Sequence, residues 1–190
     1  MPGDPQAIIR PASDDDAGAI TALRAATWRA AYDGILDRAV LDRVTLPATV
    51  PVSPPPYRRT LVAADGRHQA VVGYASHGPE RRVLPEDGAP QTAFPFSAEL
   101  TAAGAAGKTG ELYALYVTPE RWSAGVGRGL LETVVTALRE AGYERMVLWT
   151  LTGNARARRF YQKAGLVPDG ATNIITGLGG VEELRYARDL

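Results

Sequence analysis

The segment Val117–Leu131, VTPERWSAGVGRGLL, decides the fold of this chain. It reads as the end of a strand, a tight turn rich in small residues and the start of a helix. Gly125 and Gly127 are expected to let the backbone turn sharply where a side chain would collide with a close neighbour. The first N–H groups of a helix lack partners within it, and its dipole adds partial positive charge there. This turn is therefore predicted to bind a phosphate or diphosphate group.

A second segment, Asn154–Gly165, NARARRFYQKAG, follows a predicted strand at residues 146–150. Either segment alone is weak evidence, but together and in this order they resemble the acetyl-CoA-binding core of the GCN5-related N-acetyltransferase family. The second segment matches the family pattern Asn-x-x-Ala-x-x-Phe-Tyr-x-x-x-Gly at five positions, which are Asn154, Ala157, Phe160, Tyr161 and Gly165.

The resemblance implies an α/β fold with mixed α+β character, in which a twisted sheet of about six or seven strands is splayed open and flanked by about four helices. It also implies acetyl-CoA as a cosubstrate in the V-shaped gap of the sheet, with Asn154 bonded to its arm and no metal. The residues expected to contact acetyl-CoA are Leu115, Tyr116, Val117, Trp122, Ser123, Ala124, Gly125, Val126, Gly127, Arg128, Asn154, Phe160 and Tyr161.

The turn differs from the family pattern because it lacks the basic side chains that are often found there. The family has Arg or Gln, two variable residues, Gly, any residue, and then Gly or Ala. Here Trp122 holds the Arg or Gln position, as in some branches, and Ser123 and Ala124 hold positions that are often glycine and a basic residue. Arg121 or Arg128 is therefore expected to supply a bidentate phosphate contact. The backbone donors of the turn do not depend on these side chains.

Acetyl transfer from a thioester needs a neutral amine, a donor for the developing oxyanion and a proton for the leaving thiolate. Glu111 lies six residues before Val117, where one family branch keeps its catalytic glutamate, so the resemblance implies that Glu111 is the general base. Another branch keeps a glutamate where this chain has Trp149. The resemblance further implies that the Val117 N–H is the oxyanion donor and Tyr161 the general acid, in a direct transfer through a ternary complex.

Several of these residues also have structural interpretations. Glu111 could be an exposed strand residue, since a lone carboxylate is usually solvated. Tyr161 could be a packing tyrosine, although the flanking motif favours catalysis. The arginines of the second segment favour a solvated helix face over contact with the 3′-phosphate of the cosubstrate; these are Arg156, Arg158 and Arg159.

Trp28 and Tyr32 lie one helical turn apart. With Ala31 and Gly34 they resemble the Trp-x-x-Ala-Tyr-x-Gly start of one family branch. This resemblance implies that residues 1–46 form the acceptor-side helices and that the two aromatic side chains bind the substrate. An ordinary place in the core is the alternative for both rings.

Composition excludes several classes of function. The chain has no cysteine, which excludes a disulfide framework, a thiolate metal site and an acyl-cysteine mechanism. Its formal net charge of zero argues against a nucleic-acid partner. No apolar run approaches the roughly 20 residues of a membrane span, and no secretory signal is visible, so we expect a cytoplasmic protein without a membrane partner. His68 and His77 lack ligand spacing and are expected at the surface.

The chain predicts one domain over residues 1–190, with an acetyl-CoA-binding core at 110–167. The stretch 78–109 is a long insertion rich in Gly, Pro and Ala, and connections of this length are usually lids or mobile insertions. The predicted strands are 8–10, 61–64, 69–76, 111–117, 146–150 and 181–187. The predicted helices are 17–32, 37–44, 127–141 and 155–164.

The leading hypothesis is an N-acetyltransferase that acts on the primary amine of a small molecule. One alternative is acetylation of a protein N-terminus or lysine, and another is a non-catalytic acyl-CoA sensor that keeps the cofactor site without a working base. Family members are often dimers, so the resemblance suggests a homodimer as the assembly.

Overall fold

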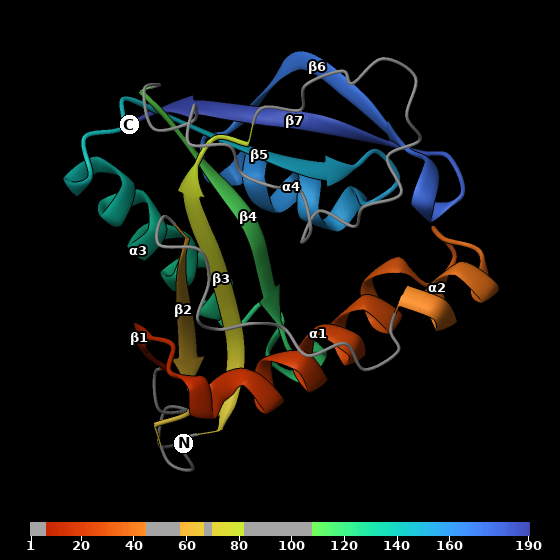
Figure 1. The fold of residues 1–190 in the computed structure, drawn as a ribbon, viewed down its shortest axis with the longest axis horizontal. Helices are drawn as coiled ribbons and strands as arrows, with labels where there is room; N and C mark the ends of the chain where they lie inside the picture. The colour runs from red at the N-terminus through yellow and green to blue at the C-terminus, as the bar shows by residue number, and fades with distance from the viewer. Residues whose placement is uncertain (1–6, 45–57, 67–69, 82–107) are drawn as a thin grey trace.

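The computed structural model describes residues 7–44, 58–66, 70–81 and 108–190. Within these residues one seven-stranded sheet runs in the order β1-β2-β3-β4-β5-β7-β6 (Figure 1). Neighbouring strands are antiparallel, except that β4 and β5 are parallel. The strands are β1 Ile8–Pro11, β2 Arg59–Ala64, β3 Val71–Pro79, β4 Thr109–Val117, β5 Arg145–Leu151, β6 Val167–Ile175 and β7 Val181–Asp189. The predicted mixed α/β class is confirmed.

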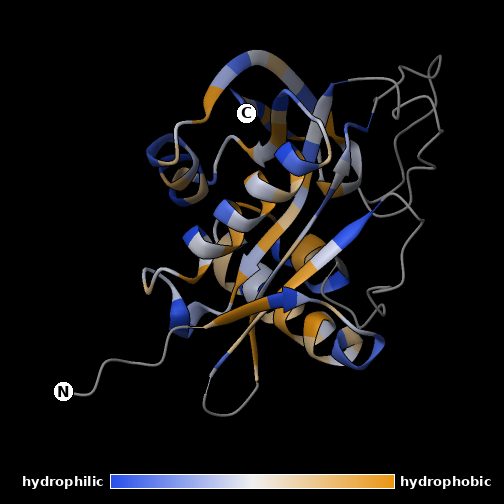
Figure 2. Cartoon of the chain, turned by 90° about the vertical axis from the view of Figure 1, so that its left-hand side faces the viewer, coloured by the Kyte–Doolittle hydropathy of each residue, from blue (hydrophilic) through white to orange (hydrophobic). Residues whose placement is uncertain are grey.

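The α-helices of the described residues lie on both faces of the sheet and are α1 Ala17–Tyr32, α2 Arg38–Val44, α3 Val126–Glu140 and α4 Ala155–Lys163. Neighbouring strand residues point to opposite faces, and here Val62 packs in a cluster with α1 while Ala63 packs in a cluster with α3. α4 joins the α3 side through Tyr161. Figure 2 shows hydrophobic residues along the strands and hydrophilic ones on outer helical turns. Burial of these apolar stripes fixes both helix layers.

A capping arrangement begins the short 3-10 helix Asp14–Asp16, which leads directly into α1. The backbone N–H of Ser13 donates to Asp16 Oδ2 at 2.8 Å, and Ser13 and Asp16 form a capping box. The Arg10 guanidinium donates to both Asp16 carboxylate oxygens at 2.7 and 2.9 Å. These bonds lower the pKa of Asp16 to about 2. The N-terminal end of α1 is thereby tied to β1.

The sheet opens between β4 and β5. These strands pair only over four positions, from Thr109 opposite Arg145 to Leu112 opposite Leu148. On the other edge of β4, His77 pairs with Leu112 and Ser76 pairs with Ala114, so Tyr113 is the extra residue of a β-bulge. A bulge bends its strand and increases the local twist. β4 therefore turns away from β5 beyond Leu112, and the predicted splay is confirmed.

The structure differs from the sequence predictions in three places. β6 was not assigned a range, because Pro168 and Gly170 interrupt its apolar pattern. His77 is not at the surface but buried in β3, where burial and, as a second cause, the charge of Arg59 lower its pKa to about 4. The insertion predicted at 78–109 contributes its ends to β3 and β4, and residues 82–107 lie outside the described part of the chain.

Candidate active site

A cavity of about 1100 Å³ occupies the opening between β4 and β5. It is walled by β4, the following turn and α3 on one side, by β5 and α4 on the other, and by α1 at one end. The residues of α1 that line it are Thr27, Ala31 and Tyr32. Almost all of the residues predicted to contact acetyl-CoA line this cavity; they are Leu115, Tyr116, Val117, Trp122, Ser123, Gly125, Gly127, Arg128, Asn154, Phe160 and Tyr161. The structure therefore brings two distant sequence segments to one site.

The turn before α3 owes its shape to left-handed backbone. Gly125 is the N-cap of α3 with φ 87°, a conformation that L side chains rarely adopt. Ser123 has φ 64° and is the only non-glycine residue of the described chain with positive φ. A Cβ at Gly127 would meet Phe160 and Val117 atoms at 3.6 Å, which is ordinary contact. The predicted collision at these glycines is thus wrong. Glycine is needed at position 125 because the backbone there adopts a left-handed conformation.

The backbone of β4 presents unpaired groups to the cavity. The Thr118 N–H donates to Val72 O of β3 at 2.9 Å. Successive N–H groups of a strand point to opposite edges, so the N–H groups of Val117 and Leu115 face away from β3, into the opening. The backbone of Tyr116 pairs with Tyr74 of β3. Tyr116 therefore lines the cavity with its backbone N–H directed at β3, whereas Leu115 and Val117 direct theirs at the opening.

Trp122 closes the turn from the side. Its indole N–H donates to Val117 O at 2.7 Å, which ties the turn to the end of β4. The guanidinium carbon of Arg156, from α4, lies 3.8 Å from the centre of the Trp122 ring. This stack joins the start of α3 to the start of α4 across the mouth of the cavity.

Basic side chains surround the cavity. Among the lining residues that the structure describes, Glu132 is the one acidic residue, and it pairs with Arg128 at 2.7 Å. The basic lining residues are Arg121, Arg128, Arg139, Arg156, Arg159, Lys163 and Arg188. The sequence interpretation of the α4 arginines as a solvated face was wrong for Arg158, which donates to Thr152 O at 3.0 Å. Their spacing along one side of α4 was the signal that could have identified Arg156, Arg159 and Lys163 as lining residues.

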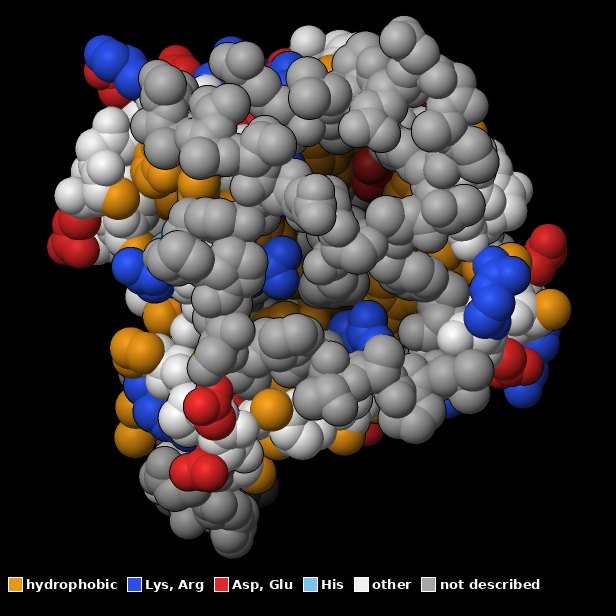
Figure 3. Space-filling model, viewed as in Figure 1, with side chains coloured by type: hydrophobic (Ala, Val, Ile, Leu, Met, Phe, Trp, Pro, Cys, Tyr) orange, Lys and Arg blue, Asp and Glu red, His pale blue; other side chains and the backbone are white. Residues whose placement is uncertain are grey.

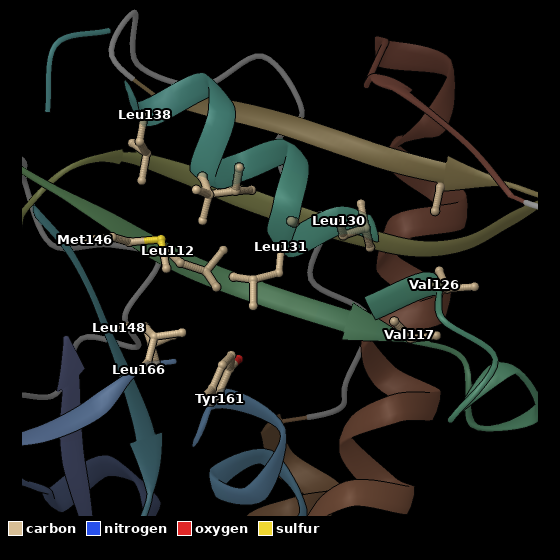
Figure 4. Packing of buried hydrophobic residues seen from close by; sticks show 14 of the residues in the cluster. Leu112, Val117, Val126, Leu130, Leu131, Leu138, Met146, Leu148, Tyr161 and Leu166 are labelled. Carbon is tan, nitrogen blue, oxygen red and sulfur yellow. The ribbon is translucent and has the colours of Figure 1, made fainter. Parts of the chain in front are cut away.

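Tyr161 is buried in α4 and lines the cavity. Figure 4 shows its ring pointing from α4 toward β4 and Leu131. Burial raises the pKa of Tyr161, and the nearby Tyr116 raises it further. The phenol therefore remains protonated at neutral pH and can donate a hydrogen bond or a proton into the opening.

Asn154 begins α4. Its side-chain oxygen accepts from the Ala157 N–H at 3.0 Å, so it acts as the N-cap of the helix. Burial raises the pKa of Tyr32, and a side-chain hydrogen bond with Asn154 opposes that change. Asn154 therefore combines a structural cap with a place in the cavity wall.

Glu111 lies away from the cavity lining. It is fully buried, which excludes the interpretation as an exposed strand residue. Its carboxylate accepts from the Arg81 backbone N–H at 2.7 Å and from Arg81 Nε at 2.9 Å, and it forms an ion pair with the same guanidinium. Burial raises the pKa of Glu111, while Arg81 opposes that change. The structure thus places the predicted base in an ion pair beside the site.

Of the two aromatic residues predicted to bind substrate, one lies in the core and the other lines the cavity. Trp28 is 5% exposed and packs in a cluster with Leu36 and Leu41, so it is a core residue. Tyr32 lines the cavity, and its ring meets the Trp28 ring edge-on at 4.9 Å between centroids. Trp28 therefore supports the position of Tyr32 from behind.

The face that carries α1 also buries two arginines that the sequence did not single out. Arg24 and Arg58 are 7% and 8% exposed, and Arg58 lies 5.3 Å from the centre of the Tyr113 ring. Figure 3 shows basic side chains among hydrophobic ones at the centre of this face. Arg24 lowers the pKa of Tyr116 against the effect of burial. The side of β4 that faces α1 thus buries arginines as well as aromatic rings.

The described residues contain neither a metal-ligand cluster nor a membrane-spanning helix. No group of three or more His, Cys, Asp or Glu residues there could hold a metal ion. No helix of that part of the chain is long and apolar enough to cross a membrane.

Comparisons with known proteins agree on one family. The model of the Acetyltransferase (GNAT) family matches residues 20–166. A mycothiol acetyltransferase of Beutenbergia cavernae is 40% identical over 60 residues, which is 32% of this chain and 20% of the relative. The match thus spans about a fifth of that curated relative.

Solved structures share the fold at low sequence identity. The PaiA N-acetyltransferase of Thermoplasma acidophilum, solved in complex with coenzyme A, superposes with a TM-score of 0.66 at 14% identity and covers 97% of this chain and 99% of its own. A GCN5-related N-acetyltransferase of Kribbella flavida gives a TM-score of 0.63 at 22% identity, with 97% and 98% covered. At this identity the likeness bears on the fold alone.

Proposed function

Because this chain belongs to the GNAT acetyltransferase family, we propose that it transfers acetyl from acetyl-CoA directly to the primary amine of a small molecule. One observation carries the proposal. β4 leaves β5 after Leu112, and the backbone groups of Leu115 and Val117 face the cavity that opens there. An extended, amide-bearing chain can add to such an edge as a strand does.

The shape and charge of the cavity fit coenzyme A from end to end. The turn at Gly125 and the first N–H groups of α3 suit a diphosphate, as a helix N-terminus favours anions. The seven basic lining residues against a single acidic one suit the three phosphates of the nucleotide end. The edge of β4 leads from this turn to Tyr161 and Tyr32, where the thioester and the amine would meet.

Two groups of the chain fit the chemistry of acyl transfer. The Val117 N–H, which points into the opening, is placed to donate to an oxyanion that develops on the thioester carbonyl. Tyr161, kept protonated by burial, is placed to donate its proton to the departing thiolate. Acetyl passes directly from sulfur to nitrogen: the amine nitrogen bonds to the carbonyl carbon, the C–S bond breaks, Tyr161 protonates the departing thiolate, and the proton lost by the nitrogen passes to water. The chain has no cysteine, which excludes an acyl-cysteine intermediate.

The acceptor end of the cavity supports a small amine. α1 contributes Thr27, Ala31 and Tyr32 to the wall of the cavity at that end. The curated relatives matched over about a third of this chain are mycothiol acetyltransferases, and the match spans about a fifth of their own length.

A thiol-release assay with an amine panel tests the proposal. The panel contains amino acids, polyamines, amino sugars, a lysine peptide and a peptide with a free N-terminus. We expect release of coenzyme A with at least one small amine. Release with peptides alone would instead support a protein acetyltransferase. Tight acetyl-CoA binding without release on any amine would support an acyl-CoA sensor.

A further inference from the structure

The turn that follows β4 lacks the basic side chain that the sequence led us to expect, and Trp122 stands in its place. A positively charged side chain nevertheless lies over the Trp122 ring. Arg156 reaches it from α4, with the guanidinium carbon 3.8 Å from the ring centre. At this distance a cation is attracted to the negative face of an indole ring, and more strongly when water is excluded.

The guanidinium of Arg156 keeps its hydrogen-bond donors available. Across the part of the chain that the structure describes, Arg156 has no ion pair or hydrogen bond. Its neighbours differ, since Arg128 pairs with Glu132 and Arg158 donates to Thr152 O. Stacking uses the face of the guanidinium and leaves its edge, which carries the N–H groups, free for an anion.

The two candidates that the sequence suggested for the phosphate contact are already engaged. Arg121 lies 3.6 Å from Asp65, and its side chain is 17% exposed. Arg128 is paired with Glu132 on the solvent side of α3, where its side chain is 80% exposed. Arg156 lines the same cavity as Ser123 and Gly125 and has neither constraint.

We propose that Arg156, held against the face of Trp122, supplies the cation for the diphosphate of acetyl-CoA that the turn itself lacks. Trp122 is then a positioning residue with two contacts. Its ring orients Arg156, and its indole N–H holds Val117 O at the end of β4. One side chain thus couples the grip on the diphosphate to the strand end that faces the thioester. The inference rests on the proposed use of acetyl-CoA.

The test is the dissociation constant of three probes, measured by calorimetry on wild type and variants. The probes are acetyl-CoA, acetyl-3′-dephospho-CoA and acetyl-pantetheine, which differ in their phosphates. We expect Arg156→Ala to weaken binding of both CoA compounds by the same factor, about 10–100-fold, as for loss of a charge-assisted bidentate contact. Binding of acetyl-pantetheine should stay within about twofold.

Arg159→Ala is the matched control, because Arg159 lies one turn further along α4 and lines the same cavity without a ring stack. For acetyl-3′-dephospho-CoA, Arg156→Ala should raise the dissociation constant at least five times more than Arg159→Ala does. Equal effects of the two variants would overturn the inference. So would a penalty that disappears with acetyl-3′-dephospho-CoA, because Arg156 would then serve the 3′-phosphate.

Trp122→Leu tests the positioning role. It should weaken CoA binding about as much as Arg156→Ala does. The double variant should lose little further affinity, because either change alone already removes the contact between Trp122 and Arg156. Additive losses would show that Trp122 does not orient Arg156. Arg156→Ala leaves the core untouched and remains decisive if Trp122→Leu fails to fold. Wild type that does not bind acetyl-CoA would refute the proposed function, whereas binding unaffected by Arg156→Ala refutes this inference alone.

Discussion

Tyr161 shows at the scale of one residue how position sets chemistry. Its ring packs between Phe160 and Tyr186, at 5.1 and 6.4 Å between centroids, and reaches the opening of the sheet. Burial there raises its pKa and keeps the phenol neutral. A neutral phenol at this position fits the proposed donation of a proton to the departing thiolate.

Tyr161→Phe should therefore lower kcat by about 100-fold and change the KM for acetyl-CoA by less than about threefold, as expected for loss of a general acid. Steady-state thiol release measures both constants. Tyr186→Phe is the matched control, since it removes a hydroxyl from the neighbouring ring, which does not line the cavity. A kcat for Tyr161→Phe equal to that of the control would remove Tyr161 from the mechanism.

Glu111 is the residue on which family resemblance and structure differ most. The resemblance predicts a general base, whereas the structure shows a buried carboxylate bonded to Arg81. Loss of one partner of a buried ion pair leaves the other charge without compensation.

Glu111→Gln should accordingly lower the free energy of unfolding by about 2–4 kcal/mol, which urea unfolding measures. If the role of Glu111 is structural, the kcat of Glu111→Gln and its pH profile, measured at low temperature, should stay close to those of wild type. A variant with unchanged stability, a kcat about 100-fold lower and no acidic limb in its pH profile would establish Glu111 as the base.

At the scale of the element, β4 determines the site. Its first four residues pair with β5, its bulge at Tyr113 begins the opening, and its last residues face the cavity. The paired start depends on close packing with α3. An ideal Cβ at Gly110 would lie 2.6 Å from Leu138 Cδ2, inside the core.

Gly110→Ala should destabilise the protein by about 1–3 kcal/mol, because Leu138 is 1% exposed and has little room to move. Thermal unfolding measures the effect. Gly18→Ala is the control, since nothing lies within 4 Å of that Cβ and alanine favours the α1 helix, which predicts a stabilisation of about 0.5–1 kcal/mol. Equal effects of both changes would contradict the packing described for β4 and α3.

The elements differed in how well sequence predicted them. The predicted bounds of α1, residues 17–32, are those of the structure, because acidic residues mark its start and a glycine follows its end. The start of α3 was found from the glycines of the turn. The bulge at Tyr113 could not be predicted, since it depends on how β3 and β4 pair and leaves no local pattern.

At the scale of the whole molecule, stability should depend on pH through a buried imidazole. Burial lowers the pKa of His77 to about 4, with Arg59 as a second cause, while the unfolded chain binds this proton near pH 6.5. The unfolded state therefore holds more protons between these values, and stability is retained above pH 6.5 and lost as the pH falls toward 4.

Urea unfolding of wild type between pH 7 and pH 4 should show this loss, which amounts to about 3 kcal/mol at most for one group. His77→Gln removes the titration and should flatten that part of the curve. Parallel stability curves for wild type and variant would contradict the buried neutral state of His77.

The sequence predicted the molecule best where one segment determines its own shape. The turn at Gly125 and the motif from Asn154 to Tyr161 were assigned from local pattern and meet in one cavity. Contacts between segments were missed, because only folding reveals that Arg156 reaches Trp122 or that Arg81 meets Glu111. Trp28 was ambiguous for the same reason, since neighbouring elements decide whether a ring lines a pocket or fills the core.

A crystal structure of the chain with bound coenzyme A tests the central claim most directly. We expect the diphosphate to lie against the turn from Ser123 to Gly127. The pantetheine arm should run along Leu115 and Val117, and the sulfur should lie near Tyr161. Coenzyme A bound elsewhere, or a ligand-soaked crystal with this opening filled by side chains, would contradict it.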